Sequence, residues 1–237
     1  MQIRSVFDPH STRNVWLVAL LLLTVLLAGC AGVSETQRPA APRSPDESAL
    51  QQTPRRFSGL SPVAPQPSDS ALKPGLAIHF HRNYNSRSLN ALTGGFVQDR
   101  PGISGAPIPQ VNHQFGRDVA LYDSGRSIFL GVRMQGLLHL PESGIYTLRA
   151  LVNDGVRIYV DDTMIVEDPR FGADRYALPA ELSITEPGWY ALKIEYFQRQ
   201  GSAVLKLFWR TPSSDTFGVI PAKAFAHTGG EFAAANP

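Results

Sequence analysis

The 237-residue sequence contains a single cysteine, Cys30. One thiol cannot form a disulfide within the molecule, and a metal site built from cysteines is excluded. The sequence also lacks a stretch rich in Lys and Arg with interleaved aromatic residues. Together with a net charge of only +2, this absence argues against nucleic acid as a partner. Internal repeats are missing, and no long apolar stretch has the helical period.

Motifs of the common enzyme classes are missing as well. The sequence has no serine elbow, Cys/His pair, phosphate-binding loop or zinc helix motif. Asp168 and Glu195 could act as a glycosidase pair if opposing sheets brought them together, but nothing in the sequence sets their separation. We therefore expect no enzymatic activity.

The beginning of the chain has the pattern of an export signal. Arg4 and Arg13 introduce an apolar run over residues 15–28, shorter than the roughly twenty residues of a membrane-spanning helix. A short apolar run after basic residues predicts a cleavable signal peptide over residues 1–29. The run ends in Leu-Ala-Gly-Cys at residues 27–30. The alternative is an ordinary signal peptide followed by a chance cysteine.

The motif at residues 27–30 resembles the lipobox of bacterial lipoproteins. The resemblance implies a diacylglyceryl group on Cys30, cleavage before it, and acylation of the new N-terminus by a fatty acid such as palmitate. Three chains would make anchoring effectively permanent, because one chain binds only marginally. Ala31 and Gly32 replace the Asp that retains lipoproteins in the inner membrane, so we expect a lipid-anchored protein of the cell envelope, at the outer membrane. Whether the domain faces the periplasm or the outside stays open.

Residues 30–73 are rich in Pro, Ser, Gln and Ala, and Phe57 is their only aromatic residue. This composition cannot bury enough apolar surface to offset the entropy of ordering. We expect a disordered linker, partly polyproline II, that tethers a folded domain to the lipid on Cys30. The small and polar residues 228–237 predict a flexible tail.

Alternation with a period of two recurs through residues 74–227 and predicts half-buried strands. Turn signals rich in Gly, Pro, Asn and Asp separate these strands. Short strands spaced in this way predict an all-β fold, an antiparallel β-sandwich. The apolar positions that carry the pattern are Leu76, Ile78 and Phe80, then Leu130, Val132 and Met134 before a break at Gly136, then Tyr146, Leu148, Ala150 and Val152, then Val156, Ile158 and Val160, then Tyr190, Leu192, Ile194 and Tyr196, and last Ala203, Leu205, Leu207 and Trp209.

Several turns combine into a more specific pattern. It consists of Val132-Arg133 before Gly136, Pro141-Glu142-Ser143-Gly144-Ile145-Tyr146, Asn153-Asp154-Gly155-Val156-Arg157, Gly188-Trp189-Tyr190 and Leu207-Phe208-Trp209. Together these motifs resemble the PA-fourteen domain family, named for a domain of anthrax protective antigen. The resemblance covers most of residues 74–227 and implies a β-sandwich that often serves as a carbohydrate-binding module. Within the motifs, we expect Gly144 and Gly155 to supply positive φ in tight turns.

The resemblance also implies a ligand site. In yeast adhesins of the family, two consecutive Asp residues before the Gly, joined by a cis peptide, hold a calcium ion that contacts sugar hydroxyls. The matching pair here is Asn153 and Asp154, so an amide replaces one carboxylate. Calcium at Asn153 and Asp154 is the only cofactor that the sequence suggests, and the lost charge weakens that site. The alternative is a turn whose short side chains cap the backbone.

A polar loop over residues 167–176, together with residues 198–201, is expected to flank Asn153. The loop contains Arg170, Phe171, Arg175 and Tyr176, and aromatic rings and guanidinium groups there would suit stacking on a sugar. Of these, Arg170 and Tyr176 are the candidate ligand-binding residues. They would suit a protein partner equally.

Two further pairs have simpler explanations. Asp161 and Asp162 predict a hairpin turn rather than a metal site. His79 and His81 share one face of a strand, and no third ligand is near in sequence. We expect them on the polar side of an edge strand.

Two functions agree with these observations. The first is a membrane-anchored lipoprotein that presents a carbohydrate-binding module to a polysaccharide or cell-envelope glycan. The second is a structural envelope lipoprotein that docks a protein complex through the same domain, and the amide of Asn153 favours it.

Overall fold

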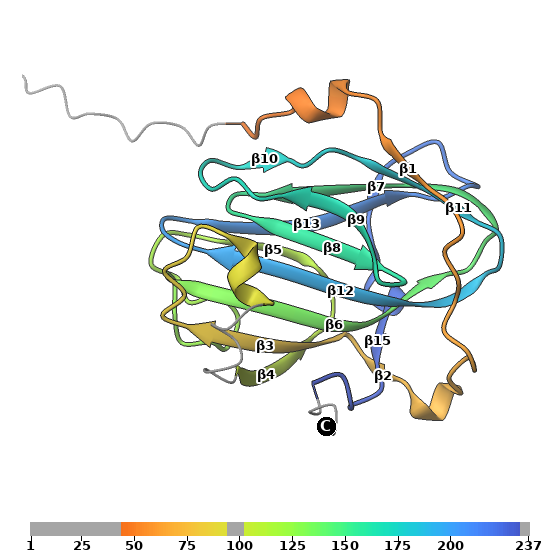
Figure 1. The fold of residues 1–237 in the computed structure, drawn as a ribbon, viewed down its shortest axis with the longest axis horizontal. Coiled ribbons are helices and arrows are strands. Elements are labelled where there is room, and N and C mark those ends of the chain that lie inside the picture. The colour runs from red at the N-terminus through yellow and green to blue at the C-terminus, as the bar shows by residue number, and fades with distance from the viewer. Residues whose placement is uncertain (1–43, 94–101, 233–237) are drawn as a thin grey trace, which may run out of the picture. The chain divides into compact units, whose positions relative to one another are not determined.

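A computed structural model describes residues 44–93 and 102–232 of the chain (Figure 1). The predicted signal peptide, Cys30 and the first part of the predicted linker lie outside the described residues. So does the end of the predicted tail, residues 233–237. Within the described part, no helix is long and apolar enough to cross a membrane.

The described residues form strands in two sheets, joined by turns and short 3₁₀ helices. Sheet A contains β1 (Arg55–Phe57), β5 (Asn112–Phe115), β7 (Gly144–Val152), β10 (Arg175–Tyr176), β11 (Ala180–Ile184), β13 (Ala203–Arg210) and β14 (Gly218–Val219). Sheet B contains β2 (Lys73–Pro74), β3 (Leu76–Arg82), β4 (Ile103–Ile108), β6 (Leu130–Leu140), β8 (Val156–Val160), β9 (Thr163–Asp168), β12 (Gly188–Gln198) and β15 (Phe225–His227). The 3₁₀ helices are η1 (Ser48–Gln51), η2 (Asp69–Ala71), η3 (Leu89–Leu92) and η4 (Ala222–Ala224).

The two sheets pack face to face as a β-sandwich (Figure 1), which confirms the predicted fold class. The main path of sheet A runs β1-β11-β7-β13-β14, and that of sheet B runs β2-β15-β6-β12-β8-β9. Neighbouring strands pair antiparallel, except that β1 runs parallel to β11. The alternating apolar residues of β3, β6, β7, β8 and β12 are buried between the sheets and form one core cluster.

Gly136 does not end its strand, as the sequence suggested, because β6 continues to Leu140 with the same buried face. Its role is to permit a close approach by β15. A Cβ atom on Gly136 would lie 2.3 Å from the backbone oxygen of Ala226. Only glycine fits there without moving one of the two strands.

The predicted linker is wrong for residues 44–73, which belong to the folded unit. β1 lengthens sheet A by pairing Arg55–Phe57 with β11. Leu60 is 4% exposed and lies in the main core cluster. Backbone hydrogen bonds join this segment to both sheets. Arg55 N donates to Pro179 O, next to β11, at 2.9 Å, and Val63 N donates to Trp189 O of β12 at 2.8 Å. The segment buries few apolar residues, but hydrogen bonds to existing strands stabilise it.

The predicted tail is partly wrong as well. Residues 228–232 fold back onto sheet B, where the Phe232 ring stacks on His79 with 3.8 Å between centroids. His79 also lies 2.8 Å from the Ser104 hydroxyl through Nε2, and His81 is only 3% exposed. β3 pairs with β4 and with β6, so the two histidines do not lie on an edge strand.

Candidate functional site

Three connections meet at one end of the sandwich, at the left in Figure 1. Residues 153–155 join β7 of sheet A to β8 of sheet B, so this short segment crosses between the sheets. Residues 169–174 join β9 to β10, and residues 199–202 join β12 to β13. The sequence correctly predicted that residues 167–176 and 198–201 flank Asn153.

Asn153 is 3% exposed, and both polar atoms of its side chain form hydrogen bonds within the protein. Its Oδ1 accepts a hydrogen bond from the hydroxyl of buried Tyr196 at 2.7 Å and another from Asp154 N at 2.7 Å. Its Nδ2 donates to the backbone oxygen of Ser202. The amide therefore ties the crossing segment to the β12–β13 connection.

Asp154 ties the same segment to both neighbouring connections. Its Oδ1 accepts from Gly172 N at 3.0 Å, and its Oδ2 accepts from Arg199 N at 2.6 Å. The residue is 3% exposed, and burial raises the pKa of its carboxyl group to about 6 although these hydrogen bonds favour the charged form.

Gly144 has the predicted positive φ, at 127°. Gly155 does not have a positive φ, so the prediction is wrong for this residue, and a glycine is needed there for lack of space. A Cβ atom on Gly155 would lie 2.3 Å from the Phe197 ring. The ring and the turn can pack together only because residue 155 has no side chain.

Arg175 is the centre of the hydrogen-bond network behind the connections. It is 5% exposed and forms a two-point ion pair with Asp168, from Nε to Oδ2 at 2.9 Å and from NH2 to Oδ1 at 2.9 Å. It also donates to the backbone oxygens of Asn153, Ala173 and, at 2.7 Å, Arg170. Burial raises the pKa of Asp168, but hydrogen bonds from Arg170 and Arg175 outweigh burial and lower it to about 2.

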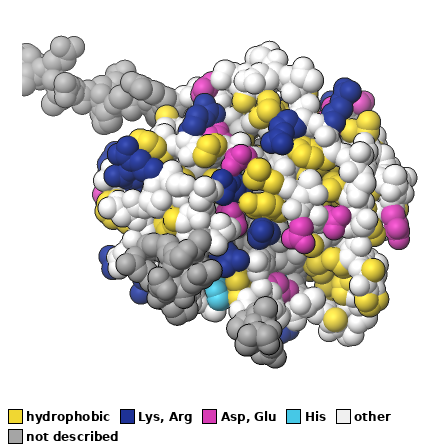
Figure 2. Space-filling view, in the orientation of Figure 1, with side chains coloured by type: hydrophobic (Ala, Val, Ile, Leu, Met, Phe, Trp, Pro, Cys, Tyr) yellow, Lys and Arg dark blue, Asp and Glu magenta, His cyan; other side chains and the backbone are white. Residues whose placement is uncertain are grey.

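A cavity of about 330 Å³ opens in front of these connections. Residues 171–174 and 199–202 line it together with Asn153, Asp154, Arg87 and Arg117. The Phe171 ring is 49% exposed, and the guanidinium carbons of Arg87 and Arg199 lie 4.5 and 5.8 Å from its centroid. Figure 2 shows Lys and Arg side chains at the left edge, the same end of the sandwich. We call this cavity the loop pocket.

Of the residues proposed from the sequence, Asn153 and Asp154 line the loop pocket, but Arg170 and Tyr176 are not among its lining residues. The Arg170 guanidinium is occupied by Asp168, with NH2 2.7 Å from Oδ2. Tyr176 pairs with Leu151 in sheet A, and its ring lies 6.2 Å from that of Phe208. Its neighbour Arg175 points inward, so Tyr176 lies on the outer face of sheet A.

Arg87 and Arg117 belong to none of the sequence motifs described above. They come from segments far from residue 153 in the chain, and no local pattern marks them. Only the folding of the sandwich brings these segments to the loop pocket.

The arrangement of Asn153 and Asp154 does not fit a calcium site. Asn153 Oδ1 faces Tyr196, and both Asp154 oxygens already accept backbone amides. Among the described residues the only cis peptide bond is Ala64–Pro65, so the bond between Asn153 and Asp154 is trans. Calcium needs several oxygen ligands, and the side-chain oxygens of Asn153 and Asp154 already accept hydrogen bonds from the protein. The turn interpretation, with short side chains capping the backbone, describes both residues.

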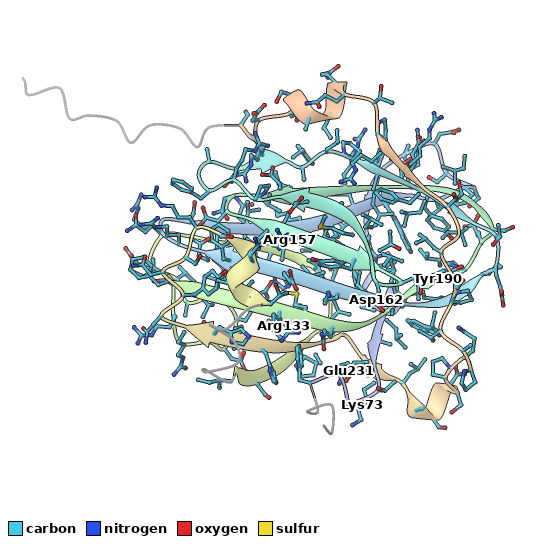
Figure 3. All side chains as sticks on the ribbon, in the orientation of Figure 1. Lys73, Arg133, Arg157, Asp162, Tyr190 and Glu231 are labelled. Carbon is cyan, nitrogen blue, oxygen red and sulfur yellow. The ribbon has the colours of Figure 1, made fainter. Side chains whose placement is uncertain are left out.

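Asp161 and Asp162 form the predicted turn between β8 and β9, with φ values of 49° and 54°. Asp162 is labelled in Figure 3. Asp161 is also used structurally, because its Oδ2 accepts from Ser61 N at 2.8 Å.

The glycosidase pair does not form between opposing sheets. Asp168 lies on β9 and Glu195 on β12, both in sheet B with β8 between them. In register, Glu195 lies between Arg133 of β6 and Arg157 of β8, the two arginines labelled in Figure 3. Asp168 is held by its own arginines instead.

Asp154 predicts a specific pH dependence of stability. Its pKa is about 6 in the folded protein against 3.8 ordinarily, so the folded state binds more protons between these values. The free energy of unfolding contributed by this group therefore decreases as the pH rises from about 4 to about 6, by about 2 to 3 kcal/mol. Asp168 has the opposite effect, because its pKa is lowered to about 2 in the folded protein. Its contribution to the free energy of unfolding is lost as the pH falls from about 4 to about 2.

Urea unfolding of the wild type and of Asp154→Asn between pH 4 and 7 tests this. The variant has no carboxyl group at this position, so its stability is expected to vary less with pH in that range. Parallel pH profiles for the two proteins would contradict the assignment.

Comparison with known proteins identifies the fold. Residues 124–222 match the model of the PA14 domain family. The predicted family resemblance is thereby confirmed for this stretch. None of the curated proteins matches the sequence.

Three solved structures illustrate the likeness of the fold. The PA14 domain of the antifreeze protein MpAFP is 15% identical with a TM-score of 0.56, covering 70% of this chain and 96% of that one. A PA14 sugar-binding domain from an RTX adhesin is 18% identical with a TM-score of 0.50, covering 65% and 98%. The A domain of epithelial adhesin 9 from Candida glabrata, in complex with Galb1-4GlcNAc, is 10% identical with a TM-score of 0.53, covering 74% and 96%. At these identities the likeness establishes the fold.

Proposed function

We propose that this protein is a membrane-anchored lipoprotein that presents its PA14-type domain as a carbohydrate-binding module. The loop pocket is the proposed ligand site, and a polysaccharide or cell-envelope glycan is the proposed ligand. The domain is assigned a binding role without catalysis. Cys30 carries the proposed lipid anchor at the outer membrane.

The half-exposed Phe171 ring at the loop pocket is the observation that carries the proposal. An exposed aromatic ring offers an apolar surface for the C–H face of a sugar. Guanidinium groups beside the ring, and backbone groups of residues 199–202, can bind hydroxyls. A few polar groups around an aromatic surface in a cavity of this size are typical of small-ligand sites.

The structural relatives give independent support. One is titled as a sugar-binding domain of an adhesin, and another was crystallised with a disaccharide. Both share the sandwich on which the loop pocket of this protein is built.

We further propose that binding does not depend on calcium. The oxygens of Asn153 and Asp154 are used by backbone and side-chain donors, so the ligand contacts fall to Phe171 and the surrounding arginines. This distinguishes the proposed site from one in which a calcium ion bridges protein and sugar.

A glycan array with the full-length protein, with and without EDTA, tests binding and metal dependence together. We expect binding that EDTA leaves unchanged and that Phe171→Ala reduces at least tenfold, because about half of the ring is available for contact. Ile145→Ala is the matched control, since Ile145 is an apolar residue, 57% exposed, near the opposite end of β7. Absence of binding to any glycan, including the polysaccharides of the source organism, would contradict the proposal.

The anchor needs a separate test. Labelling of growing cells with palmitate is expected to mark the wild-type protein, and Cys30→Ser is expected to abolish the label and release the protein from membranes. An unlabelled wild-type protein would show that residues 27–30 are not a lipobox.

A further inference from the structure

We infer that the loop pocket selects acidic saccharides, those that carry carboxylate or sulfate groups, over neutral ones. This inference rests on the proposed function and names the class of ligand. It is carried by the convergence of Arg87, Arg117 and Arg199 on one cavity.

The three arginines come from separate parts of the chain. Arg87 precedes η3, Arg117 lies between β5 and β6, and Arg199 directly follows β12. The ion pairs found in the described residues involve other arginines, namely Arg56, Arg157, Arg170 and Arg175. Within that part of the chain, no carboxylate forms an ion pair with any of the three pocket arginines.

The acidic residues that line the loop pocket do not neutralise these charges. Asp154 is 3% exposed and directs both oxygens to backbone amides of the pocket wall. Asp174 is partly buried, and burial raises the pKa of its carboxyl group against the opposing charges of Lys206 and Arg175. The cavity therefore presents three cationic groups, and no carboxylate of the described residues is ion-paired with them.

Phe171 positions two of these groups. The guanidinium carbons of Arg87 and Arg199 lie 4.5 and 5.8 Å from the centroid of the same ring. Cation–π attraction holds each cation near the ring, although the two cations repel each other. A bound anion would relieve this repulsion.

The chemistry of the guanidinium group determines the class of anion. Its planar array of N–H donors matches the paired oxygens of a carboxylate or sulfate, which it can bind through two hydrogen bonds. A neutral sugar offers only hydroxyls, which gain much less from three cations. We therefore expect a uronic acid or a sulfated sugar in the loop pocket.

Calorimetry on the full-length protein in detergent can test the inference with paired polymers. Polygalacturonate is compared with fully methyl-esterified polygalacturonate, dextran sulfate with dextran, and poly-L-glutamate serves as an acidic polymer without sugar. We expect at least one acidic polysaccharide to bind about tenfold or more tightly than its neutral partner. Arg87→Gln, Arg117→Gln and Arg199→Gln are each expected to weaken that binding about tenfold, the loss typical of one charged hydrogen bond.

Arg56→Gln is the control, because it removes the same charge from a side chain that is 79% exposed on β1. An equal loss of affinity in Arg56→Gln would mean general attraction of polyanions and would overturn the inference. Equal binding of poly-L-glutamate would overturn it in favour of an acidic protein. Equal binding of neutral and acidic polysaccharides, unaffected by the pocket variants, would overturn it while leaving the proposed function intact. Binding of no saccharide at all would defeat both.

Discussion

Replacing Arg175 with methionine is expected to lower the free energy of unfolding by about 3 to 5 kcal/mol, the usual cost of removing one partner of a buried ion pair. Asp168 is only 4% exposed and would lose a two-point hydrogen-bonded partner. The backbone oxygens of Asn153, Ala173 and Arg170 would lose a donor at the same time. Urea unfolding of the variant measures the loss.

Arg170→Gln is the matched control for this change. Arg170 pairs with the same carboxylate, but its own side chain is 60% exposed, so water can replace its contribution. We expect a loss below about 1 kcal/mol, as for surface ion pairs. A similar loss in both variants would show that burial does not distinguish the two arginines. Since Arg175 holds the walls of the loop pocket, its replacement is also expected to weaken ligand binding, whereas Arg170→Gln should preserve it.

Leu60→Ala is expected to destabilise the protein by about 2 to 4 kcal/mol, although composition places this residue in a proline-rich linker. The side chain is 4% exposed and packs in the main core cluster, so its truncation leaves a cavity between the sheets. Thermal and urea unfolding both report this loss.

Ser58→Ala, two positions away on the same segment, is the control because its side chain is exposed. We expect its effect on unfolding to stay within about 0.5 kcal/mol. If Leu60→Ala also changed nothing, residues 44–73 would be a tether that merely lies along the domain.

The strands between residues 129 and 210 could be predicted because large apolar residues alternate along them and face the core. Tyr190, Leu192, Ile194 and Tyr196 alternate in the sequence and all face the core in β12. Such strands show their burial directly in the order of residues. The family resemblance was visible for a related reason, since its turns need particular residues.

Residues 44–73 could not be predicted in the same way. Their stability comes from hydrogen bonds to the backbone of β11 and β12, such as that from Val63 N to Trp189 O. Backbone donors and acceptors are the same in every residue, so their use leaves almost no trace in composition. Leu60 is a single buried residue among exposed or partly buried ones, so no hydrophobic periodicity marks it in the sequence.

The sequence predicted where the candidate site lies, but only some of the residues that line it. Asn153 and Asp154 do line the loop pocket, because they belong to a turn that sequence motifs reveal. Arg170 and Tyr176 are not among the lining residues, since Arg170 is ion-paired with Asp168 and Tyr176 lies on the outer face of sheet A. Phe171, between them in sequence, holds the exposed ring instead.

The sequence alone therefore determined the β-sandwich and the turn at which the proposed site lies, because alternation and turn residues are local signals. Only the tertiary structure decided which side chains face the pocket. It brings Arg87, Arg117 and Arg199 together from three segments, and it commits the oxygens of Asn153 and Asp154 to internal hydrogen bonds. The physical reason is that charge and hydrogen-bond availability depend on which groups meet in space, and distant segments meet only when both sheets have formed.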